Sequence, residues 1–256
     1  MIDIGTGPPL LLIPGIQGRW EWMDLAVEAL SREFRVIASS LPGEPGSNTV
    51  LDGEQGFDGF IGYVDALLDA KNIESAVVCG VSFGGLIALR YAARRPERVR
   101  ALILVSTPGP NWTPEPHQQR HMASPVLSSP LFALRAVRRS WQELRVTYPD
   151  WGARVRFCAR VVPRVLTAPA SPWRMGMRAR MAVAERFDGD CACITAPTLV
   201  VTGERDLDKV VRQDDSMSYL TTIEGAQFQL FERTGHLGTI SAPDRFAAIV
   251  SRFLNG

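Results

Sequence analysis

A serine lies inside a cluster of glycines in the stretch VVCGVSFGGLIAL, residues 77–89. The residues from Gly80 to Gly84 match the pattern G-x-S-x-G, with Ser82 at the centre, an apolar run before it and a helical pattern after it. At a sharp turn from strand to helix, side chains at the two glycine positions would clash, and the serine hydroxyl stands above the strand end. We therefore predict that Ser82 is a nucleophile, with a structural glycine-rich turn as the alternative.

A serine hydroxyl is a weak nucleophile unless a base lies beside it. The chain has three histidines, and two of them, His117 and His121, fall in a region of irregular pattern. His236 instead follows an apolar run in the glycine-flanked loop RTGHLG, late in the chain and after Ser82. Its place in the chain order makes His236 the predicted general base.

The acid that orients such a histidine is expected at another strand end, between the serine and the histidine in the chain. The segment VVTGERDLD offers Glu204, Asp206 and Asp208. We predict Asp206, because it lies three residues past Gly203 at the turn after the strand. Glu204 lies closer to the strand, and Asp208 is expected to begin a helix as its N-cap.

The developing negative charge on the substrate oxygen needs hydrogen-bond donors that are already in place. One predicted donor is the backbone N–H of Phe83, which directly follows the serine. A second is expected from the loop Pro14–Gly18, which ends the apolar run PLLLIPG. Ile16 is the predicted donor in that loop, with Gln17 as the alternative.

The elements that must position these residues alternate along the chain. Alternating strands and helices predict an α/β fold with a mostly parallel central sheet covered by helices on both faces. Catalytic residues should then lie just past the carboxyl ends of the strands. The predicted strands are residues 9–15, 34–40, 75–80, 99–107, 196–206 and 226–236, and the clearest helices are residues 19–33, 57–72, 84–97 and 242–254.

The alternation stops between residues 110 and 193, which predicts a helical cap inserted into a core made of residues 1–109 and 194–256. From residue 111 to residue 190 there are thirteen arginines against six acidic residues, a net charge of about +7. One hypothesis is a cationic lid that favours anionic substrates; a solvated basic face is the alternative. Trp20, Trp22, Trp112 and Trp141 are predicted substrate contacts, although aromatic residues of the cap serve equally well as its core.

Composition excludes several classes of function. The 256 residues carry a formal net charge of +1, which gives no reason to expect a nucleic-acid partner. Four cysteines form no secreted disulfide framework, and no signal peptide or membrane-spanning apolar run is present, so we expect a cytoplasmic protein without a membrane partner. The chemistry predicted above needs neither metal nor organic cofactor, and nothing in the sequence indicates an oligomeric state.

The order Ser82, Asp206, His236, together with the loop after PLLLIPG and the insertion, resembles the α/β-hydrolase superfamily over essentially the whole chain, in its serine-nucleophile esterase and lactonase-like branch. Three features depart from that resemblance: Pro14-Gly15 stands where members commonly have His-Gly, Ser40 stands where an aspartate is usual, and the family's first strand is missing.

The resemblance implies hydrolysis of a carboxylic ester, thioester or lactone of a small molecule through an acyl-enzyme. Carbon–carbon bond hydrolysis and acyl transfer use the same three residues, and some proteins of this fold bind ligands without turnover. The partner implied is therefore a small-molecule acyl substrate.

Overall fold

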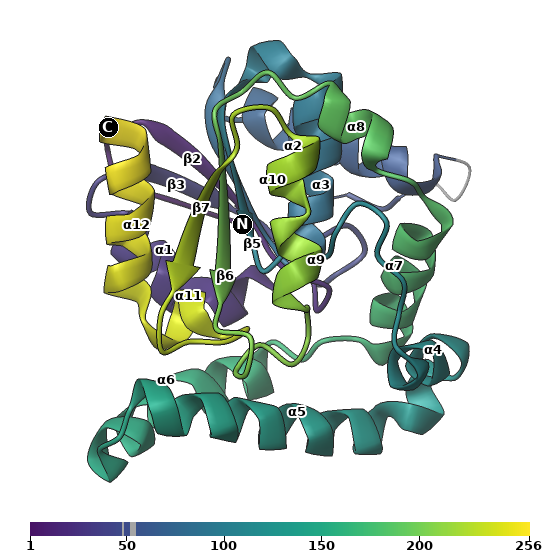
Figure 1. Cartoon of the computed structure of the whole chain (residues 1–256), viewed down its shortest axis with the longest axis vertical. Coiled ribbons are helices and arrows are strands. Elements are labelled where there is room, and N and C mark those ends of the chain that lie inside the picture. The colour runs from purple at the N-terminus through teal and green to yellow at the C-terminus, as the bar shows by residue number, and fades with distance from the viewer. Residues whose placement is uncertain (48, 52–54) are drawn as a thin grey trace.

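The computed structural model describes residues 1–47, 49–51 and 55–256, which form a central sheet with helices on both sides (Figure 1). Its strands run in the order β1-β3-β2-β4-β5-β6-β7. Six of them are parallel, whereas the edge strand β1 runs antiparallel to β3. The predicted mostly parallel sheet is confirmed. The strands are β1 (Ile2–Ile4), β2 (Pro9–Ile13), β3 (Arg35–Ala38), β4 (Ala76–Val81), β5 (Val99–Val105), β6 (Thr198–Gly203) and β7 (Gln227–Phe231).

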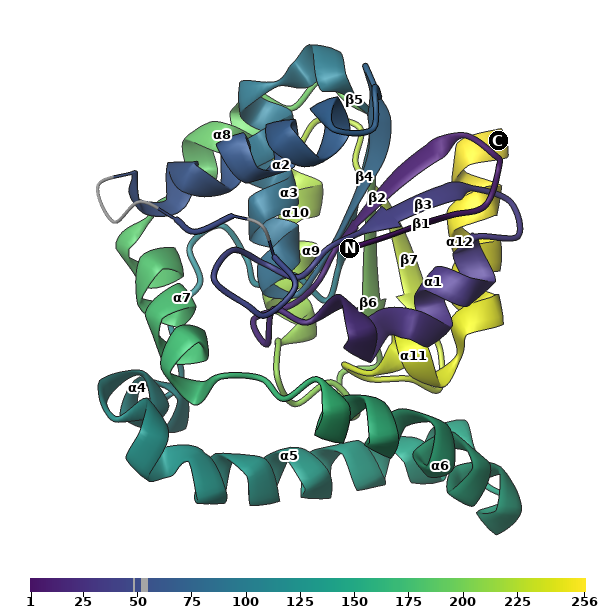
Figure 2. The same ribbon diagram turned by 180° about the vertical axis from the view of Figure 1, so that it is seen from behind.

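Side chains alternate along each strand and so divide the core into two layers. On β5, Leu102 and Leu104 point into one layer, while Ala101, Ile103 and Val105 point into the other. The first layer is covered by α2 (Gly59–Asp69), α3 (Phe83–Arg94) and α10 (Tyr219–Thr222), and the second by α1 (Asp24–Leu30) and α12 (Pro243–Asn255). Figures 1 and 2 show these two groups of helices on opposite faces of the sheet.

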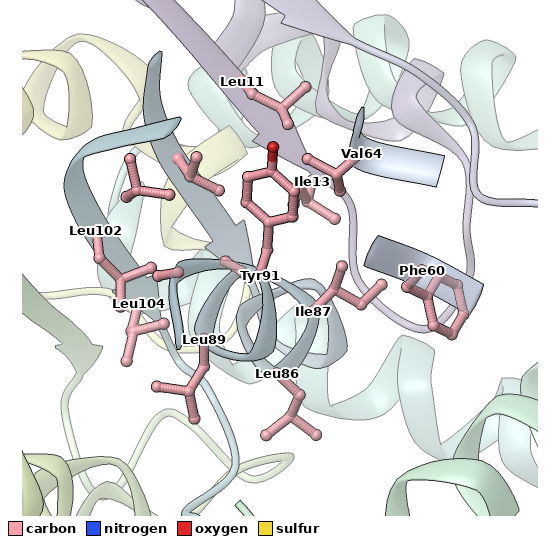
Figure 3. Close-up of a cluster of buried hydrophobic side chains, with 14 of the residues drawn as sticks. Leu11, Ile13, Phe60, Val64, Leu86, Ile87, Leu89, Tyr91, Leu102 and Leu104 are labelled. Atoms are coloured by element: carbon pink, nitrogen blue, oxygen red, sulfur yellow. The ribbon is translucent and has the colours of Figure 1, made fainter. Parts of the chain in front are cut away.

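Helix α3 is fixed firmly against the sheet, which matters because it carries the residue after Ser82. Leu86, Ile87 and Leu89 are almost fully buried and pack with Leu11 and Leu102 of the neighbouring strands (Figure 3). Burying a leucine or isoleucine side chain contributes about 1.5–3 kcal/mol. The turn that holds Ser82 therefore lies between a buried strand and a buried helix.

Between β5 and β6 the chain forms α4 (Pro116–Ala123), α5 (Pro125–Thr147), α6 (Trp151–Thr167), α7 (Pro172–Ala184) and α8 (Asp188–Ala192). Helices α5 and α6 lie across the carboxyl edge of the sheet, toward which the arrowheads of β6 and β7 point (Figure 1). Helix α8 packs instead on α3 and α10, and Phe187 and Cys191 belong to the core cluster. The cap limits of 110–193 stay a prediction, and this packing favours an end before Phe187.

Short elements complete the description of the chain. They are the 3₁₀ helices η1 (Trp20–Met23), η2 (Gly56–Asp58) and η3 (Pro96–Arg98), and the α-helices α9 (Gln213–Met217) and α11 (Gly238–Ser241). Among the described residues, none of the helices combines the length and the apolar character needed to cross a membrane. The longest, α5, has 23 residues, but arginines and a glutamate interrupt its apolar positions.

Candidate active site

Ser82 occupies a strained turn between β4 and α3. Its backbone angles are φ 55° and ψ −121°, a region that non-glycine residues rarely adopt and that costs about 1–3 kcal/mol. A Cβ on Gly80 would lie 2.2 Å from the Gly84 carbonyl oxygen, and one on Gly84 would lie 2.4 Å from the Ile13 oxygen. The steric need for both glycines is therefore confirmed. The Ser82 amide donates to the Val105 oxygen at 2.8 Å, which ties the turn to β5.

The structure pairs His236 with Asp208. His236 lies in the loop of residues 232–237 that joins β7 to α11, here called the His236 loop, and its Nδ1 is 3.1 Å from Asp208 Oδ2. Because a carboxylate can only accept, Nδ1–H donates and Nε2 is left free to take a proton. The Asp208 side chain is 2% exposed, and its Oδ1 accepts from the amides of Val210 and Val211 at 3.0 Å each. This capped turn holds the carboxylate toward the histidine.

The prediction that Asp206 orients His236 is wrong in this geometry. The Asp206 side chain is 97% exposed and lies 3.8 Å from Lys209 Nζ. The amide of Asp208 donates to the Glu204 oxygen at 2.9 Å, so the chain makes one tight turn past the strand and points residue 208 inward. Asp208 was predicted to begin a helix, but α9 begins at Gln213.

Glu204, the third carboxylate of the segment, is hydrogen-bonded to the backbone of the His236 loop. Its Oε1 accepts from the Arg233 amide at 2.6 Å, and its own amide donates to the Thr234 oxygen at 2.8 Å. These bonds fasten the loop to the end of β6 without contacting the imidazole. Glu204 is therefore a structural neighbour of the His236–Asp208 pair.

Burial and charge oppose each other at this pair. Burial lowers the pKa of His236, but the carboxylates of Asp208 and Glu143 outweigh it, so the pKa is raised above its usual value. Burial raises the pKa of Asp208, but His236 and the backbone donors outweigh it, so that pKa is lowered. The pair therefore keeps Asp208 ionised and makes His236 a stronger base than an ordinary histidine.

Two cavities meet at Ser82. The larger, of about 240 Å³, is lined by Ser82, His236, Ile16 and Gln17, and the smaller, of about 100 Å³, is lined by Ser82, Ile16 and Phe83. The predicted nucleophile and base thus border one space. The roles of the Phe83, Ile16 and Gln17 amides as oxyanion donors stay predictions. All three residues border the cavities that Ser82 lines.

A buried arginine of the cap fixes the loop that contains Ile16. Arg178 on α7 donates to the Ile16 oxygen at 3.0 Å and to the Pro42 oxygen at 3.2 Å. Its charge is balanced by Glu44, 2.9 Å away and equally buried. The loop turns back on itself, because the Gly18 amide donates to the Gly15 oxygen at 2.9 Å. The cap therefore helps to shape the predicted oxyanion loop.

The four tryptophans divide into two pairs. Trp22 lines the larger cavity and donates from Nε1 to the Ala168 oxygen at 2.8 Å, and Trp112 lines the smaller one, so both stay predicted substrate contacts. Trp20 borders a separate surface depression beside β1, and Trp141 is 38% exposed, packed edge-on against Trp151 at 5.7 Å. These two predictions are wrong.

The reason for the error at Trp141 is the orientation of α5. The residues of this helix that face the larger cavity are Phe132, Ala136, Arg139, Ser140 and Glu143, which recur at helical spacing. Trp141 follows Ser140 by one residue and therefore points about 100° away, toward solvent. This inner face is partly polar, whereas Leu131 and Leu134 are exposed, so a helical wheel for residues 125–147 would have turned the apolar side inward.

Two charged residues of that face were missed by sequence reasoning. Glu143 is almost fully buried, and both of its carboxylate oxygens accept from the Leu237 amide. Arg139 is partly buried, which lowers its pKa, and it makes no ion pair among the residues that the structure describes. Lys209 also lines the larger cavity. The space beside His236 is therefore bordered by two cations and one buried carboxylate.

Neither of the other two histidines is described in contact with the His236–Asp208 pair. His121 lines the smaller cavity and stacks on Phe132 with ring centroids 4.4 Å apart, and the side chain of His117 lies outside the described part of the structure. Across the described residues, no three His, Cys, Asp or Glu side chains gather closely enough to hold a metal ion.

The chain is similar in sequence to known hydrolases over most of its length. The chain is 28% identical to a 2-hydroxymuconate semialdehyde hydrolase of Pseudomonas sp. (strain CF600), over 98% of this chain and 88% of that protein. It is 27% identical to 3-oxoadipate enol-lactonase 1 of Acinetobacter baylyi (strain ATCC 33305 / BD413 / ADP1), over 89% and 81%.

The fold is shared with solved structures. The crystal structure of the enol-lactonase from Burkholderia xenovorans LB400 superposes with a TM-score of 0.78 at 21% identity, covering 100% of this chain and 95% of that one. The family model for the alpha/beta hydrolase fold matches residues 8–139, just over half of the chain. The protein therefore belongs to the alpha/beta hydrolase family and is an enzyme of that family.

Proposed function

We propose that the protein is a serine hydrolase that cleaves an ester, thioester or lactone of a small molecule through an acyl-enzyme. The observation that carries this proposal is the convergence of Ser82, on its strained turn, and the His236–Asp208 pair on one cavity. The relative named for an enol-lactone supports it, because a lactone is a cyclic ester.

In the proposed reaction, Ser82 Oγ attacks the carbonyl carbon while His236 Nε2 takes its proton. Asp208 holds the imidazole in this tautomer and stabilises the imidazolium that forms. The amides of Phe83 and of Ile16, or of Gln17 in its place, donate to the carbonyl oxygen as it becomes negative. His236 then returns the proton to the leaving oxygen or sulfur, and a water molecule releases the acyl group by the same steps in reverse.

The two cavities suggest how the substrate lies. His236 must protonate the leaving group, and it borders the larger cavity, so we assign the leaving group to that side and the acyl group to the smaller one. At about 100 Å³, the acyl-side cavity is less than half the size of the other, which is about 240 Å³. Short acyl groups should therefore fit best.

A series of p-nitrophenyl esters tests this assignment. We expect kcat/KM to be highest for acetate and butanoate and to fall for octanoate, because a long chain does not fit the smaller cavity. A preference for octanoate would contradict the assignment of the acyl group. Lactones of matched size should be turned over by the same protein, since ring opening follows the same steps.

Hydrolysis of a carbon–carbon bond is the second candidate. It is favoured by the relative named for 2-hydroxymuconate semialdehyde, which matches over almost the whole chain. The two candidate reactions are distinguished by comparing kcat/KM for a diketone-like dienol acid with kcat/KM for the best ester. A clearly higher value for the diketone-like compound, lost on replacement of Ser82, would put this candidate first.

A further inference from the structure

The carboxyl-terminal part of α5 is fastened to the His236 loop. At the surface, Thr147 Oγ1 donates to the Arg233 oxygen at 2.8 Å, and the Arg233 guanidinium donates to the Val146 oxygen at 2.8 Å. Beneath these bonds, Leu144 of α5 packs in one apolar cluster with Ile240 of α11. A helix of the cap therefore contacts both sides of the loop that carries the predicted base.

Glu143 is the buried member of this contact. Its side chain comes from the inner face of α5, and its two oxygens lie 3.0 and 3.1 Å from the amide nitrogen of Leu237. Leu237 directly follows His236, so the acceptor fixes the peptide plane next to the imidazole. Glu143 and His236 also line the same cavity.

Placing the Glu143 carboxylate at this buried position costs free energy. Burial raises the pKa of Glu143, and although the amides of Leu237 and Gly235 and the charge of His236 oppose this, the pKa stays above its usual value. Burying a charge without a full set of partners destabilises a fold. A neutral residue would suit the packing better, so the position calls for an explanation beyond stability.

We propose that Glu143 is a positioning residue, through which cap helix α5 holds the backbone of the His236 loop in the conformation that presents His236 to Ser82. This inference rests on the proposed function, because it assigns His236 the role of general base. It adds a task for the cap: besides covering the cavity, the cap supports the catalytic loop directly.

The charge of Glu143 has a second consequence. The charged groups that face His236 are Asp208 from the loop after β6, and Glu143 and Arg139 from α5; Lys209 lines the same cavity. Burial lowers the pKa of His236, both carboxylates raise it, and Arg139 lowers it. Loss of the Glu143 charge should therefore lower the pKa of His236 and move the acidic limb of the kcat/KM profile to lower pH.

Three variants separate the two effects. Glu143→Gln keeps an oxygen that accepts from Leu237 but removes the charge, whereas Glu143→Ala removes both. Gln142→Ala is the matched control, because Gln142 neighbours Glu143 on α5 but is exposed to solvent. With a short p-nitrophenyl ester, we expect Glu143→Ala to lower the plateau kcat by about 10²-fold, the effect of a small misplacement of a catalytic group, with a smaller change in KM.

For Glu143→Gln we expect a plateau kcat within a few-fold of the wild type and an acidic limb at lower pH. Gln142→Ala should match the wild type in both. A wild-type plateau in Glu143→Ala would overturn the proposal.

Nuclear magnetic resonance titration of the histidine ring protons reads the same effect without turnover. The chain has three histidines, so the His236 signal is assigned by its loss in His236→Gln. We expect the His236 pKa to be lower in Glu143→Gln than in the wild type. If the titration moves as expected but the wild type hydrolyses no acyl compound, the proposed function fails and the contact stands. An unchanged titration contradicts the charge effect.

Stability distinguishes positioning from a purely structural role. A carboxyl group whose pKa is raised by folding favours the folded state below its unfolded pKa, and this contribution is lost as pH rises through the folded value. Glu143→Gln should therefore raise Tm at neutral pH, with the difference shrinking toward pH 4. A lower Tm at neutral pH would mean that the charge of Glu143 serves the fold.

Discussion

At the scale of single residues, the direction in which a side chain points decides its contacts more than its position in the sequence does. Asp208 lies two residues after Asp206, yet one carboxylate is buried against His236 and the other extends into solvent. A tight turn that begins at the Glu204 carbonyl makes the difference. The predicted base is therefore oriented by an aspartate whose own second oxygen is held by two backbone amides.

Substitution of Asp208 and substitution of Asp206 should have very different effects on kcat. We expect Asp208→Asn to lower kcat by about 10⁴-fold, because the amide no longer selects the tautomer with Nε2 free. Asp206→Asn is the matched control and should leave kcat unchanged, since its side chain contacts solvent and Lys209. Steady-state rates for a short ester provide the measurement. Equal losses in both variants would argue against the pairing.

The residue types of the site could be predicted from the sequence. Which of several neighbouring residues of the same type takes part could not. Ser82 follows from its glycines and His236 from its place in the chain, because each has few competitors. Three carboxylates within five residues share the same strand end, and the sequence does not show how that turn closes. Glu143 was missed because it lies in the cap, outside the order of serine, acid and histidine.

At the scale of elements, two cap helices hold the loops that contain the predicted site residues. Helix α5 contacts the His236 loop, and α7 contacts the predicted oxyanion loop through Arg178. Arg178 is fully buried, and its partner Glu44 is buried with it. The two loops that flank Ser82 are therefore held from the cap side as well as from the sheet.

Removal of Arg178 should destabilise the protein because the buried Glu44 would lose its closest cation and keep only the more distant Arg174. For Arg178→Met we expect a loss of about 3–5 kcal/mol in the free energy of unfolding, measured by urea denaturation. Arg174→Met is the control on the same helix, because Arg174 is more exposed and lies 3.7 Å from Glu44. The Arg174 side chain is 38% exposed and makes the longer contact, so its removal should cost less than that of Arg178. Similar losses in both variants would contradict a special role for Arg178.

The core elements could be predicted because their apolar runs end at Pro, Gly, small polar or charged residues. The cap helices were harder to predict for a physical reason. Helix α5 exposes Leu131 and Leu134 to solvent while its inner face carries Arg139 and Glu143, so the usual apolar-inside pattern is weakened. Whether Trp141 faces the cavity depends on that orientation, and its assignment was wrong, as was that of Trp20, which lies in η1.

At the scale of the whole molecule, charge is unevenly distributed. The segment from residue 111 to residue 190 carries about +7, so the remainder carries about −6 to give the total of +1. Arg139 brings part of that positive charge into the larger cavity, where Lys209 adds to it.

A matched pair of substrates tests whether this charge favours anions. We expect 3-carboxyphenyl acetate to have a higher kcat/KM than its neutral 3-carbamoyl analogue at low ionic strength, with the advantage shrinking as salt screens the charges. Arg139→Gln should reduce the advantage if the carboxylate contacts Arg139. Equal kcat/KM values for the two substrates at low salt would contradict the hypothesis that the cationic cap favours anionic substrates.

The most direct test of the central claim is the turnover of Ser82→Ala with a short acyl ester, measured beside the wild type at the plateau of its pH profile. We expect a loss of about 10⁶-fold, by analogy with removal of the nucleophile in known serine hydrolases. We also expect that a fluorophosphonate probe labels the wild type and not the variant. Turnover that is unaffected by Ser82→Ala would contradict the assignment of Ser82 as the nucleophile.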